Sequence, residues 1–318
     1  MIGEREIDGV SCLTLASTAA GGIEIAFAPG AGMIGCSLRH RGEELLGQRS
    51  GLGRYAEAGR TMGIPLLYPW ANRLGGRRFE VAGAEVDLGL PGLRFSTDGA
   101  GLPMHGLLAG AGGWQVERHE AGDDGGILSA RFDFAAQPLL LEAFPFPHEL
   151  RLEAELDAAE LTIATSVRPS DAASVPVAFG FHPYLQLPGV PREQWEVVIP
   201  VRERLLLDDR MLPTGETASA AIEPGPLGER AFDDAFRAPS GGEPFVLAGG
   251  GRRLELRFVE GYPFAQVYAP ADDEVIAFEP MTAPTDALRS GRDLPFVSPG
   301  AEFTTRFTLT IKAGRARR

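Results

Sequence analysis

The segment Val175-Pro-Val-Ala-Phe-Gly-Phe-His-Pro-Tyr184 decides how the rest of the sequence is interpreted. Valine and phenylalanine favour a buried, extended strand, and the apolar run is too short for a stable helix. Pro183 disfavours the helical region for His182 and has no backbone N–H, so we expect the strand to end at His182. An imidazole at the end of a buried strand can face a cleft while its backbone is held in place.

A second segment of the same construction lies near the C-terminus, in Val275-Ile-Ala-Phe-Glu-Pro280. Glu279 follows an apolar run and precedes a proline, so we expect it to close a strand as well. Two ionisable side chains held at strand ends are typical of a general acid and a general base that face one pocket. The sequence therefore predicts that His182 and Glu279 form a catalytic pair.

Composition and periodicity predict one large all-β domain over residues 1–318. Hydrophobic residues make up 44% of the chain, which is enough for a sizeable core, and the 41 glycines and 25 prolines punctuate many short strands. No segment keeps the helical period for three turns, which leaves antiparallel sheets in a large β-sandwich as the expected fold. Predicted strands cover residues 22–29, 33–38, 79–88 (a hairpin turning at Gly83), 114–118, 128–134, 150–156, 161–167, 254–258, 264–268 and 303–311.

Charge and cysteine content exclude several classes of protein. A net charge of −13 argues against binding to nucleic acid phosphates, and no apolar run reaches the length of about 20 residues that a membrane helix needs. The first residues lack the apolar segment of a secretion signal, so we expect a soluble cytoplasmic protein, either a monomer or a homodimer. Cys12 and Cys36 match no disulfide framework or zinc pattern, and Cys36 is expected to be a small buried residue.

The remaining histidines and one loop carry weaker signals. His40, His119 and His148 lie in charged or proline-rich surroundings and are predicted to be surface or hairpin residues. His105 precedes Gly106 in a turn, where the glycine allows another backbone or a ligand to come close, although a histidine bonded to a carbonyl would fit equally. Residues 201–228 are predicted to be the longest irregular region, and such loops often border sites.

The densest unusual segment, Trp70-Ala-Asn-Arg73, indicates a polyhydroxylated ligand. Sugars offer hydroxyl groups to Arg73 and Asn72, and they offer apolar C–H faces to a ring such as that of Trp70. A turn capped by these polar side chains is the alternative interpretation. Further along, Phe232-Asp-Asp-Ala-Phe236 is either a solvated acidic turn or a source of one carboxylate that accepts a sugar hydroxyl.

Other chemistries have less support in the sequence. His105, His182 and Glu279 include ligand types that bind zinc or iron, but they lack the short spacing of a metal site. No GxSxG elbow, GxGxxG loop or phosphate loop is present. We therefore expect no metal and no cofactor.

Taken together, these motifs resemble those of the aldose 1-epimerase (galactose mutarotase) family. The resemblance is carried, in the family's order and over most of the chain, by Pro69-Trp-Ala-Asn-Arg-Leu74, His105-Gly106, Phe181-His-Pro-Tyr184, Phe232-Asp233 and Phe278-Glu-Pro280. It implies a large antiparallel β-sandwich with a cleft on one sheet. It also implies a cofactor-free isomerase that interconverts the α and β anomers of a hexose.

The resemblance assigns roles to particular residues. Glu279 matches the family's general base and His182 its general acid, whereas His105 and Arg73 match residues that hold the sugar. Either Asp233 or Asp234 matches a third sugar ligand, and Asp233 is preferred because it directly follows the aromatic residue. Asn72 accompanies Arg73 in its motif. We expect His182 to begin the reaction protonated and burial to raise the pKa of Glu279.

Three alternatives stay open at this point. Relatives acting on hexose 6-phosphates need cations at the cleft rim, which Arg54, Arg60, Arg77 and Arg78 could supply, although solvated turns are the preferred interpretation of these arginines. A non-catalytic carbohydrate-binding module on the same fold would not need both His182 and Glu279. A carbohydrate lyase or hydrolase ranks last, since it requires a second close carboxylate or an activated tyrosine.

Overall fold

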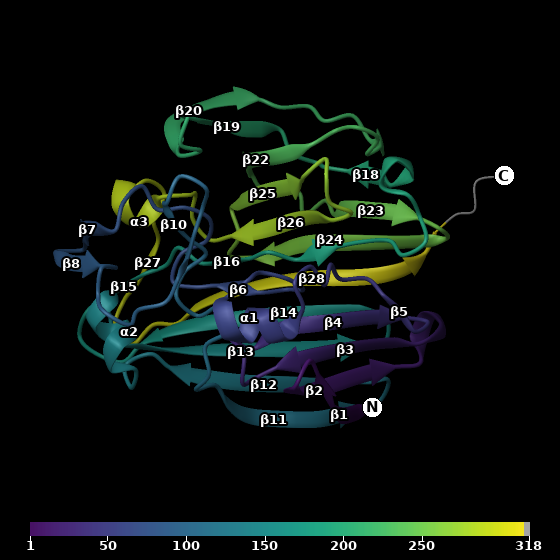
Figure 1. Ribbon diagram of the computed structural model, residues 1–318, viewed down its shortest axis with the longest axis horizontal. Helices are drawn as coiled ribbons and strands as arrows, with labels where there is room; N and C mark the ends of the chain where they lie inside the picture. The colour runs from purple at the N-terminus through teal and green to yellow at the C-terminus, as the bar shows by residue number, and fades with distance from the viewer. Residues whose placement is uncertain (315–318) are drawn as a thin grey trace.

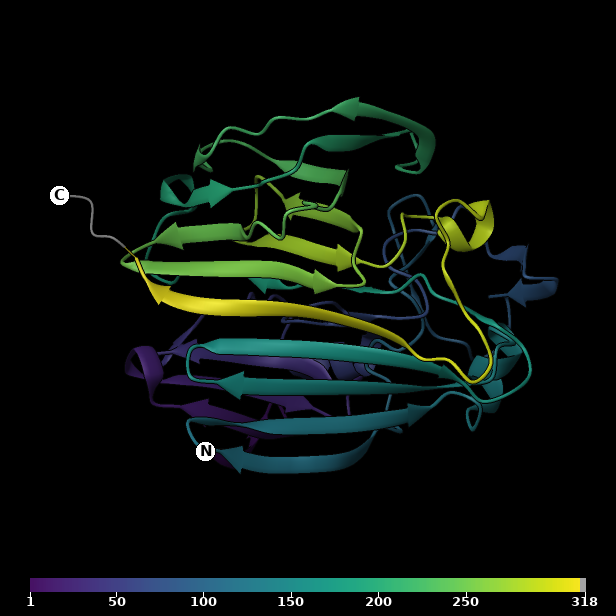
Figure 2. The same ribbon diagram turned by 180° about the vertical axis from the view of Figure 1, so that it is seen from behind.

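The computed structural model describes residues 1–314, which fold into two layers of antiparallel sheet. Figure 2 shows a long nine-stranded sheet forming one layer, and Figure 1 shows a five-stranded and an eight-stranded sheet side by side in the other. The predicted β-sandwich is confirmed, and each of the predicted strand segments contains strand residues. The predicted hairpin at Gly83 is also confirmed, with that glycine at φ 77°.

The nine-stranded sheet comprises, in spatial order, β11 (Gln115–Gly122), β12 (Gly125–Asp133), β13 (His148–Asp157), β14 (Glu160–Pro169), β28 (Phe303–Ala313), β24 (Arg252–Glu260), β23 (Phe245–Gly249), β18 (Glu196–Val198) and β21 (Gly225–Pro226). Strict alternation builds this layer: Leu150 and Leu152 of β13 are buried, whereas Arg151 between them is exposed. The apolar side chains of the sheet pack against those of the second layer and form the core between them.

The second layer consists of two sheets. The five-stranded sheet comprises β1 (Ile2–Ile7), β2 (Val10–Ser17), β3 (Ile23–Ala28), β4 (Ile34–His40) and β5 (Glu43–Glu44). The eight-stranded sheet comprises β20 (Pro213–Ser219), β19 (Glu203–Leu207), β22 (Phe232–Arg237), β25 (Phe264–Ala269), β26 (Ile276–Met281), β16 (Gly180–Phe181) and β6 (Leu66–Leu67), with β17 (Tyr184–Leu185) paired to β26.

Short elements connect these sheets. Three two-stranded ribbons join β7 (Arg78–Val81) to β8 (Ala84–Asp87), β9 (Ser96–Thr97) to β10 (Pro103–Met104), and β15 (Val175–Pro176) to β27 (Phe296–Val297). The helical elements are α1 (Leu52–Ala58), α2 (Pro138–Ala143), α3 (Ala287–Ser290) and the 3₁₀ turns η1 (Ala19–Gly21) and η2 (Arg192–Gln194). Within residues 1–314, no helix has the length and apolar character required to cross a lipid bilayer.

Two expectations about strand ends had different outcomes. The strand before His182 ends at Phe181, one residue before the predicted end, and the chain resumes pairing only at Tyr184. The expectation that Glu279 closes a strand is wrong, because β26 continues through Pro280 to Met281. Pairing with β25 extends to the end of β26, and this ladder keeps the backbone extended past the proline.

Other sequence predictions also need correction. Residues 201–228 are not irregular, because β19 and β20 form an antiparallel hairpin there. The polar, exposed residues of β20 carry no apolar alternation, which explains why the pattern missed the strand. His40 and His148 are buried rather than exposed, while His119 is half-buried. Their polar neighbours in sequence point away from them on alternating strand faces.

Candidate active site

Strand register brings the predicted site residues to one face of the eight-stranded sheet. Gln266 lies directly opposite Glu279 across β25 and β26, and Asp233 lies opposite Tyr268 across β22 and β25. Residues paired in this way share a face, as do residues two apart on one strand. Tyr184 joins the same face because it pairs with Ala277, two residues before Glu279.

His182 reaches this face from the break between β16 and β17. Its Nε2 lies 3.3 Å from Oε1 of Glu279, and the two side chains are 5% and 2% exposed. The other polar atoms of the pair, Nδ1 of His182 and Oε2 of Glu279, are buried and have no hydrogen-bond partner among residues 1–314. Buried polar groups usually find partners, so these two atoms are candidates for contacts with a ligand.

Burial shifts the pKa values of both members of the pair toward their neutral forms. For Glu279, burial raises the pKa well above its usual value and the Asp233 carboxylate adds to the increase, while Arg73 opposes it. The direction for Glu279 agrees with the sequence expectation. Phe278, the residue before Glu279, packs against Phe245 at 5.2 Å between ring centroids.

The expectation that His182 starts as an imidazolium is not supported. Burial lowers the pKa of His182 well below its usual value, and the neighbouring His105 and Arg49 lower it further. The ring of His182 stacks on Tyr184 at 4.0 Å between centroids, which helps to keep it out of water. One proton shared between His182 and Glu279 therefore describes the resting pair, with neutral groups favoured.

Arg73 lies at the centre of a polar network in the cleft. Its Nε donates to Asp98 Oδ2 at 3.0 Å, its Nη1 donates to Asn72 Oδ1 at 3.0 Å, and its Nη2 lies 3.6 Å from Asp233 Oδ2. Asp233 in turn accepts a hydrogen bond from Gln266 at 2.7 Å. Arg73 is thereby held from several sides, and this fixed orientation suits recognition of sugar hydroxyl groups.

His105 and Asn72 hold unusual backbone conformations beside this network. Their φ angles are 63° and 56°, in the left-handed region that few residues other than glycine adopt. The His105 N–H donates to the Asn72 carbonyl at 2.9 Å, which ties the two turns together. Gly106 follows, where a Cβ would lie 2.1 Å from the Tyr68 carbonyl oxygen, so the predicted close approach is made by a backbone.

His105 is buried, and its pKa is correspondingly low. Burial lowers this pKa to about 3, with a further contribution from the Arg73 cation. Its ring meets the ring of His182 edge to face at 5.6 Å between centroids. Neutral His105 therefore offers one donor and one acceptor nitrogen at neutral pH.

Aromatic residues line the cleft, but Trp70 is not among them. The expectation that Trp70 offers a face to a sugar is wrong, because its indole is 2% exposed and belongs to the core between the layers. Tyr184 and Tyr268 contribute to the cleft wall instead. The Tyr184 hydroxyl is hydrogen-bonded to Thr61 at 2.8 Å, which orients the phenol.

The cleft encloses about 280 Å³. All six predicted site residues contribute to its wall: His105, His182, Glu279, Arg73, Asn72 and Asp233. Asp234 points to the opposite face of β22, where it pairs with Arg204. The volume is close to the lower end of the usual range for small-molecule sites, about 300 Å³, and suits a monosaccharide.

Several residues of the site carried no sequence signal. Asp98 holds Arg73 from the loop between β9 and β10, and Gln266 holds Asp233 from β25. Thr61, Arg49 and Tyr268 line the cleft itself, each from a different segment. Only Tyr184 could have been found, since it follows the His182-Pro183 pair. Among residues 1–314, no group of three His, Cys, Asp or Glu side chains is arranged to hold a metal ion.

Comparison with solved structures shows the same fold in distant relatives. A galactose mutarotase-like protein from Clostridium acetobutylicum superposes with a TM-score of 0.83 at 19% identity, covering 99% of each chain. A galactose 1-epimerase from Lactobacillus acidophilus NCFM superposes with a TM-score of 0.77 at 14% identity, again covering 99% of each chain. At these identities the likeness concerns the fold. No curated protein sequence matches the chain.

A family match complements this likeness at the level of sequence. The aldose 1-epimerase family matches residues 15–310, a span that begins in β2, ends in β28 and contains every residue of the cleft described above. The match thus covers most of the chain, and the motifs noted in the sequence fall within it. The chain belongs to the aldose 1-epimerase family.

Proposed function

We propose that this protein is a cofactor-independent aldose 1-epimerase that interconverts the α and β anomers of a hexose. The contact between His182 Nε2 and Glu279 Oε1, at 3.3 Å in a buried cleft, is the observation that supports this proposal most strongly. Mutarotation requires one proton to leave the anomeric hydroxyl and another to reach the ring oxygen, so it needs an acid and a base close together.

The proton count of the pair suits this reaction. A neutral carboxyl with a neutral imidazole and a carboxylate with an imidazolium hold the same single proton, and they differ only in its position. Burial favours the neutral form of both groups in the free protein. A bound sugar brings hydroxyl groups into the cleft, and we infer that these stabilise the form in which Glu279 is a carboxylate and His182 carries the proton.

The reaction then proceeds in balanced steps. Glu279 accepts the proton of the O1 hydroxyl, the C1–O5 bond breaks with its electron pair passing to O5, and His182 gives its proton to O5. The product is an open-chain aldehyde. Rotation about the C1–C2 bond exposes the other face of the carbonyl, and reversal of the proton transfers closes the ring to the opposite anomer.

The other cleft residues hold the sugar in this proposal. Arg73, fixed by Asn72 and Asp98, donates to ring hydroxyls, and Asp233 accepts from one of them. His105 supplies a neutral nitrogen at the cleft wall. Since these groups are oriented before the sugar binds, little further ordering opposes the reaction.

Polarimetry tests the proposal directly. Freshly dissolved α-D-glucose and α-D-galactose should relax to anomeric equilibrium faster with the wild-type protein than in buffer. Glu279→Gln should lower kcat by about 10²- to 10⁴-fold, because the amide is nearly isosteric but cannot accept the proton. If no sugar relaxes faster than in buffer, a carbohydrate-binding module is the better description, and binding of glucose to Glu279→Gln by calorimetry would identify it.

A hexose 6-phosphate is the second candidate substrate, and one observation favours it. Of the arginines that could bind a phosphate, Arg60 lines the cleft that contains His182 and Glu279. Arg54 and Arg78 are engaged in ion pairs with Glu57 and Asp87. Polarimetry with α-D-glucose 6-phosphate separates the candidates: a preference of tenfold or more over glucose that is lost in Arg60→Ala would assign the phosphorylated substrate.

A further inference from the structure

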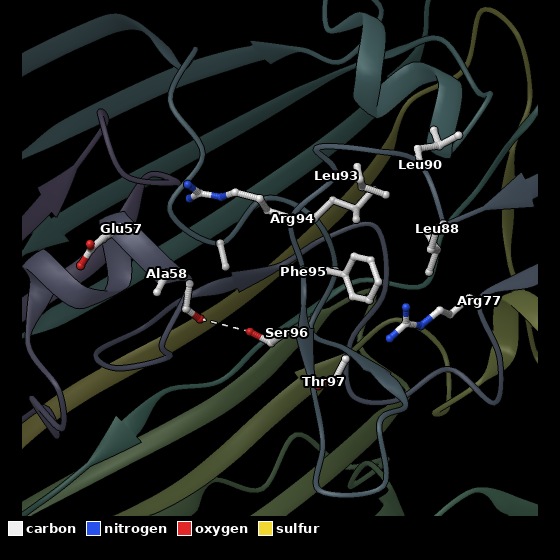
Figure 3. Close-up of a pocket in the computed structure, with 15 residues that line it drawn as sticks. Glu57, Ala58, Arg77, Leu88, Leu90, Leu93, Arg94, Phe95, Ser96 and Thr97 are labelled. Atoms are coloured by element: carbon white, nitrogen blue, oxygen red, sulfur yellow. Dashed lines mark hydrogen bonds between the residues drawn. The ribbon is translucent and has the colours of Figure 1, made fainter.

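The backbone shortly after Arg73 contains two glycines, Gly75 and Gly76, which have no side chains to anchor it. This segment also runs between two clefts, because Arg73 lines the cleft of the candidate active site and Arg77 lines a neighbouring cleft of about 480 Å³. Figure 3 shows the Arg77 side chain beside the Phe95 ring in that second cleft. The position of the backbone at Gly75 therefore depends on its hydrogen bonds.

Asp286, from the loop between β26 and α3, makes two hydrogen bonds to this backbone. Its N–H donates to the Arg73 carbonyl at 3.1 Å, and its Oδ1 accepts from the Gly75 N–H at 2.7 Å. One residue therefore binds the chain on both sides of Leu74. The side chain of Asp286 is only 11% exposed, so water competes weakly for the Gly75 N–H.

Asp286 is itself held in a defined conformation. Its φ angle is 64°, in the left-handed region that aspartate and asparagine tolerate better than most residues. Its carbonyl accepts from the Ser290 N–H at 2.9 Å, which ties it to α3. The Nη1 of Arg289 donates to Oδ2 of Asp286 at 3.0 Å. The carboxylate is thus presented to Gly75 in a fixed orientation.

The segment that ends at Asp286 begins with Glu279 in β26. Between them, the Thr282 N–H and hydroxyl both donate to the Phe179 carbonyl, at 2.9 and 3.0 Å. Phe179 belongs to the apolar segment that precedes His182. Residues 279–286 therefore carry the candidate base, contact the segment before the candidate acid, and end on the residue that holds the arginine backbone.

We propose that Asp286 is a positioning residue that fixes the backbone of Arg73 and thereby orients its guanidinium toward the sugar. This inference rests on the proposed epimerase function. Asp98 binds the guanidinium itself at Nε, whereas Asp286 binds the main chain from which that side chain extends. Since Arg73 holds the sugar in the ground state and the transition state alike, its displacement should raise KM with little effect on kcat.

Polarimetry with two substitutions at Asp286 tests the proposal. Asp286→Ala removes the acceptor for the Gly75 N–H and should raise KM about tenfold, with kcat within about threefold of the wild-type value. Asp286→Asn keeps an oxygen acceptor and tolerates the left-handed backbone, so its KM should stay within about twofold of wild type. An unchanged KM in Asp286→Ala, or equal increases in both variants, would overturn the proposal.

A matched control separates positioning from a general loss of stability. Asp8 also has a left-handed backbone, with a φ angle of 51°, and its Oδ2 accepts from the Leu52 N–H at 2.9 Å. Asp8→Ala removes the same kind of hydrogen bond away from Arg73. It should lower the Tm in thermal unfolding and leave KM unchanged. An increase in KM as large as that of Asp286→Ala would contradict the positioning role.

A double-mutant cycle shows whether the effect of Asp286 passes through Arg73. In the Arg73→Ala background, Asp286→Ala should change KM by less than about twofold, because no guanidinium remains to be oriented. The same increase in KM in both backgrounds would indicate a purely structural role for Asp286 and would overturn the proposal.

Two measurements that need no turnover separate failure of this proposal from failure of the epimerase function. Hydrogen exchange of the Gly75 amide should be about tenfold faster in Asp286→Ala than in wild type and nearly unchanged in Asp286→Asn. If the protein accelerates no sugar, calorimetry with glucose should still give a Kd about tenfold higher in Asp286→Ala. An unchanged exchange rate or an unchanged Kd in Asp286→Ala would overturn the proposal, whatever the outcome for the epimerase function.

Discussion

Two of the buried histidines, His148 and His182, differ in their hydrogen bonding. His148 is 0% exposed, and its Nδ1 donates to the Phe146 carbonyl at 2.5 Å. Its Nε2 must then accept from the Tyr68 hydroxyl, 2.7 Å away. In the candidate active site, Nδ1 of His182 and Oε2 of Glu279 have no such partners among residues 1–314.

This difference in hydrogen bonding distinguishes a structural histidine from a candidate catalytic histidine better than the directions of their pKa shifts do. Burial lowers the pKa of His148 to about 4 and also lowers that of His182. Both rings are therefore neutral near pH 7, and the shifts alone do not tell them apart. His148 also stacks on Phe134 at 4.5 Å between centroids. A buried histidine whose two ring nitrogens both have hydrogen-bond partners stabilises the core. The His182–Glu279 pair faces a cleft and has polar atoms without partners, so these atoms are available to a substrate.

The largest effect should come from breaking the pair in the cleft. His182→Asn should lower kcat by about 10²- to 10⁴-fold, because one of the two assisted proton transfers is lost. The free energy of unfolding should change by less than about 1 kcal/mol or should increase, since catalytic groups are seldom optimised for stability. Polarimetry and urea unfolding of the same samples measure both. A loss of more than about 2 kcal/mol in the free energy of unfolding would indicate that His182, like His148, has a structural role.

The opposite result is expected for His148. His148→Ala should lower the free energy of unfolding by roughly 2–4 kcal/mol, because it leaves a cavity and a buried Tyr68 hydroxyl without its partner. The kcat of the folded protein should stay within about threefold of wild type. Tyr68→Phe, which removes only the hydroxyl, serves as the graded control at about 1 kcal/mol. A hundredfold loss of kcat at unchanged stability would reverse the assignment.

Acid should weaken the fold through the same histidine. The folded pKa of His148 is about 4, below the unfolded value of 6.5, so the unfolded state binds more protons as the pH falls. Its stabilising contribution is complete above pH 6.5 and is lost toward pH 4, by up to roughly 3 kcal/mol. Urea unfolding at pH 7, 5.5 and 4.5 measures the slope. His148→Gln should make the slope smaller, with His105 and His182 still contributing to it, and an identical slope in that variant would contradict the prediction.

The smallest effect is expected for Asp98, whose carboxylate has hydrogen-bond partners as His148 does, but which contacts Arg73 of the cleft wall. One oxygen accepts from Arg73 and the other accepts from the backbone N–H groups of Ala100 and Leu102. Asp98→Asn weakens the hold on Arg73, so kcat/KM should fall about tenfold, mainly through a higher KM. Steady-state polarimetry separates the two constants. A change in kcat alone would argue against a positioning role.

Most of the fold could be predicted from the sequence, because the alternation of apolar and polar residues in a strand is a local property of the chain. Apolar alternation marked strands such as β13 and β14, and the proline after His182 marked a true strand end. The exposed strand β20 lacks that alternation, and Pro280 did not end β26 because its ladder with β25 continues. Burial of His148 was also missed, because its neighbours on the strand alternate between faces.

The residues of the candidate site also differ in whether a local sequence pattern reveals them. Short motifs marked His182, Glu279 and His105, because each of these residues is followed by a proline or glycine that constrains the backbone, and Arg73 was marked by its neighbours Trp70 and Asn72. Asp98 and Gln266 carry no such mark, and only the folded chain shows that they hold Arg73 and Asp233. Conversely, the sequence predicted that the ring of Trp70 contacts the C–H face of a sugar, whereas this residue lies in the core.

The fold class, the strand segments and the reactive residues can be predicted from the amino-acid sequence, since they depend on local pattern and residue chemistry. The tertiary structure alone decided which of those residues meet. The register of β25 against β26 places Gln266 beside Glu279, and a one-residue shift would turn Glu279 into the core. The tertiary structure also buries His182 and Glu279 in the cleft. Burial shifts both pKa values toward the neutral forms, so that the two groups hold one proton between them.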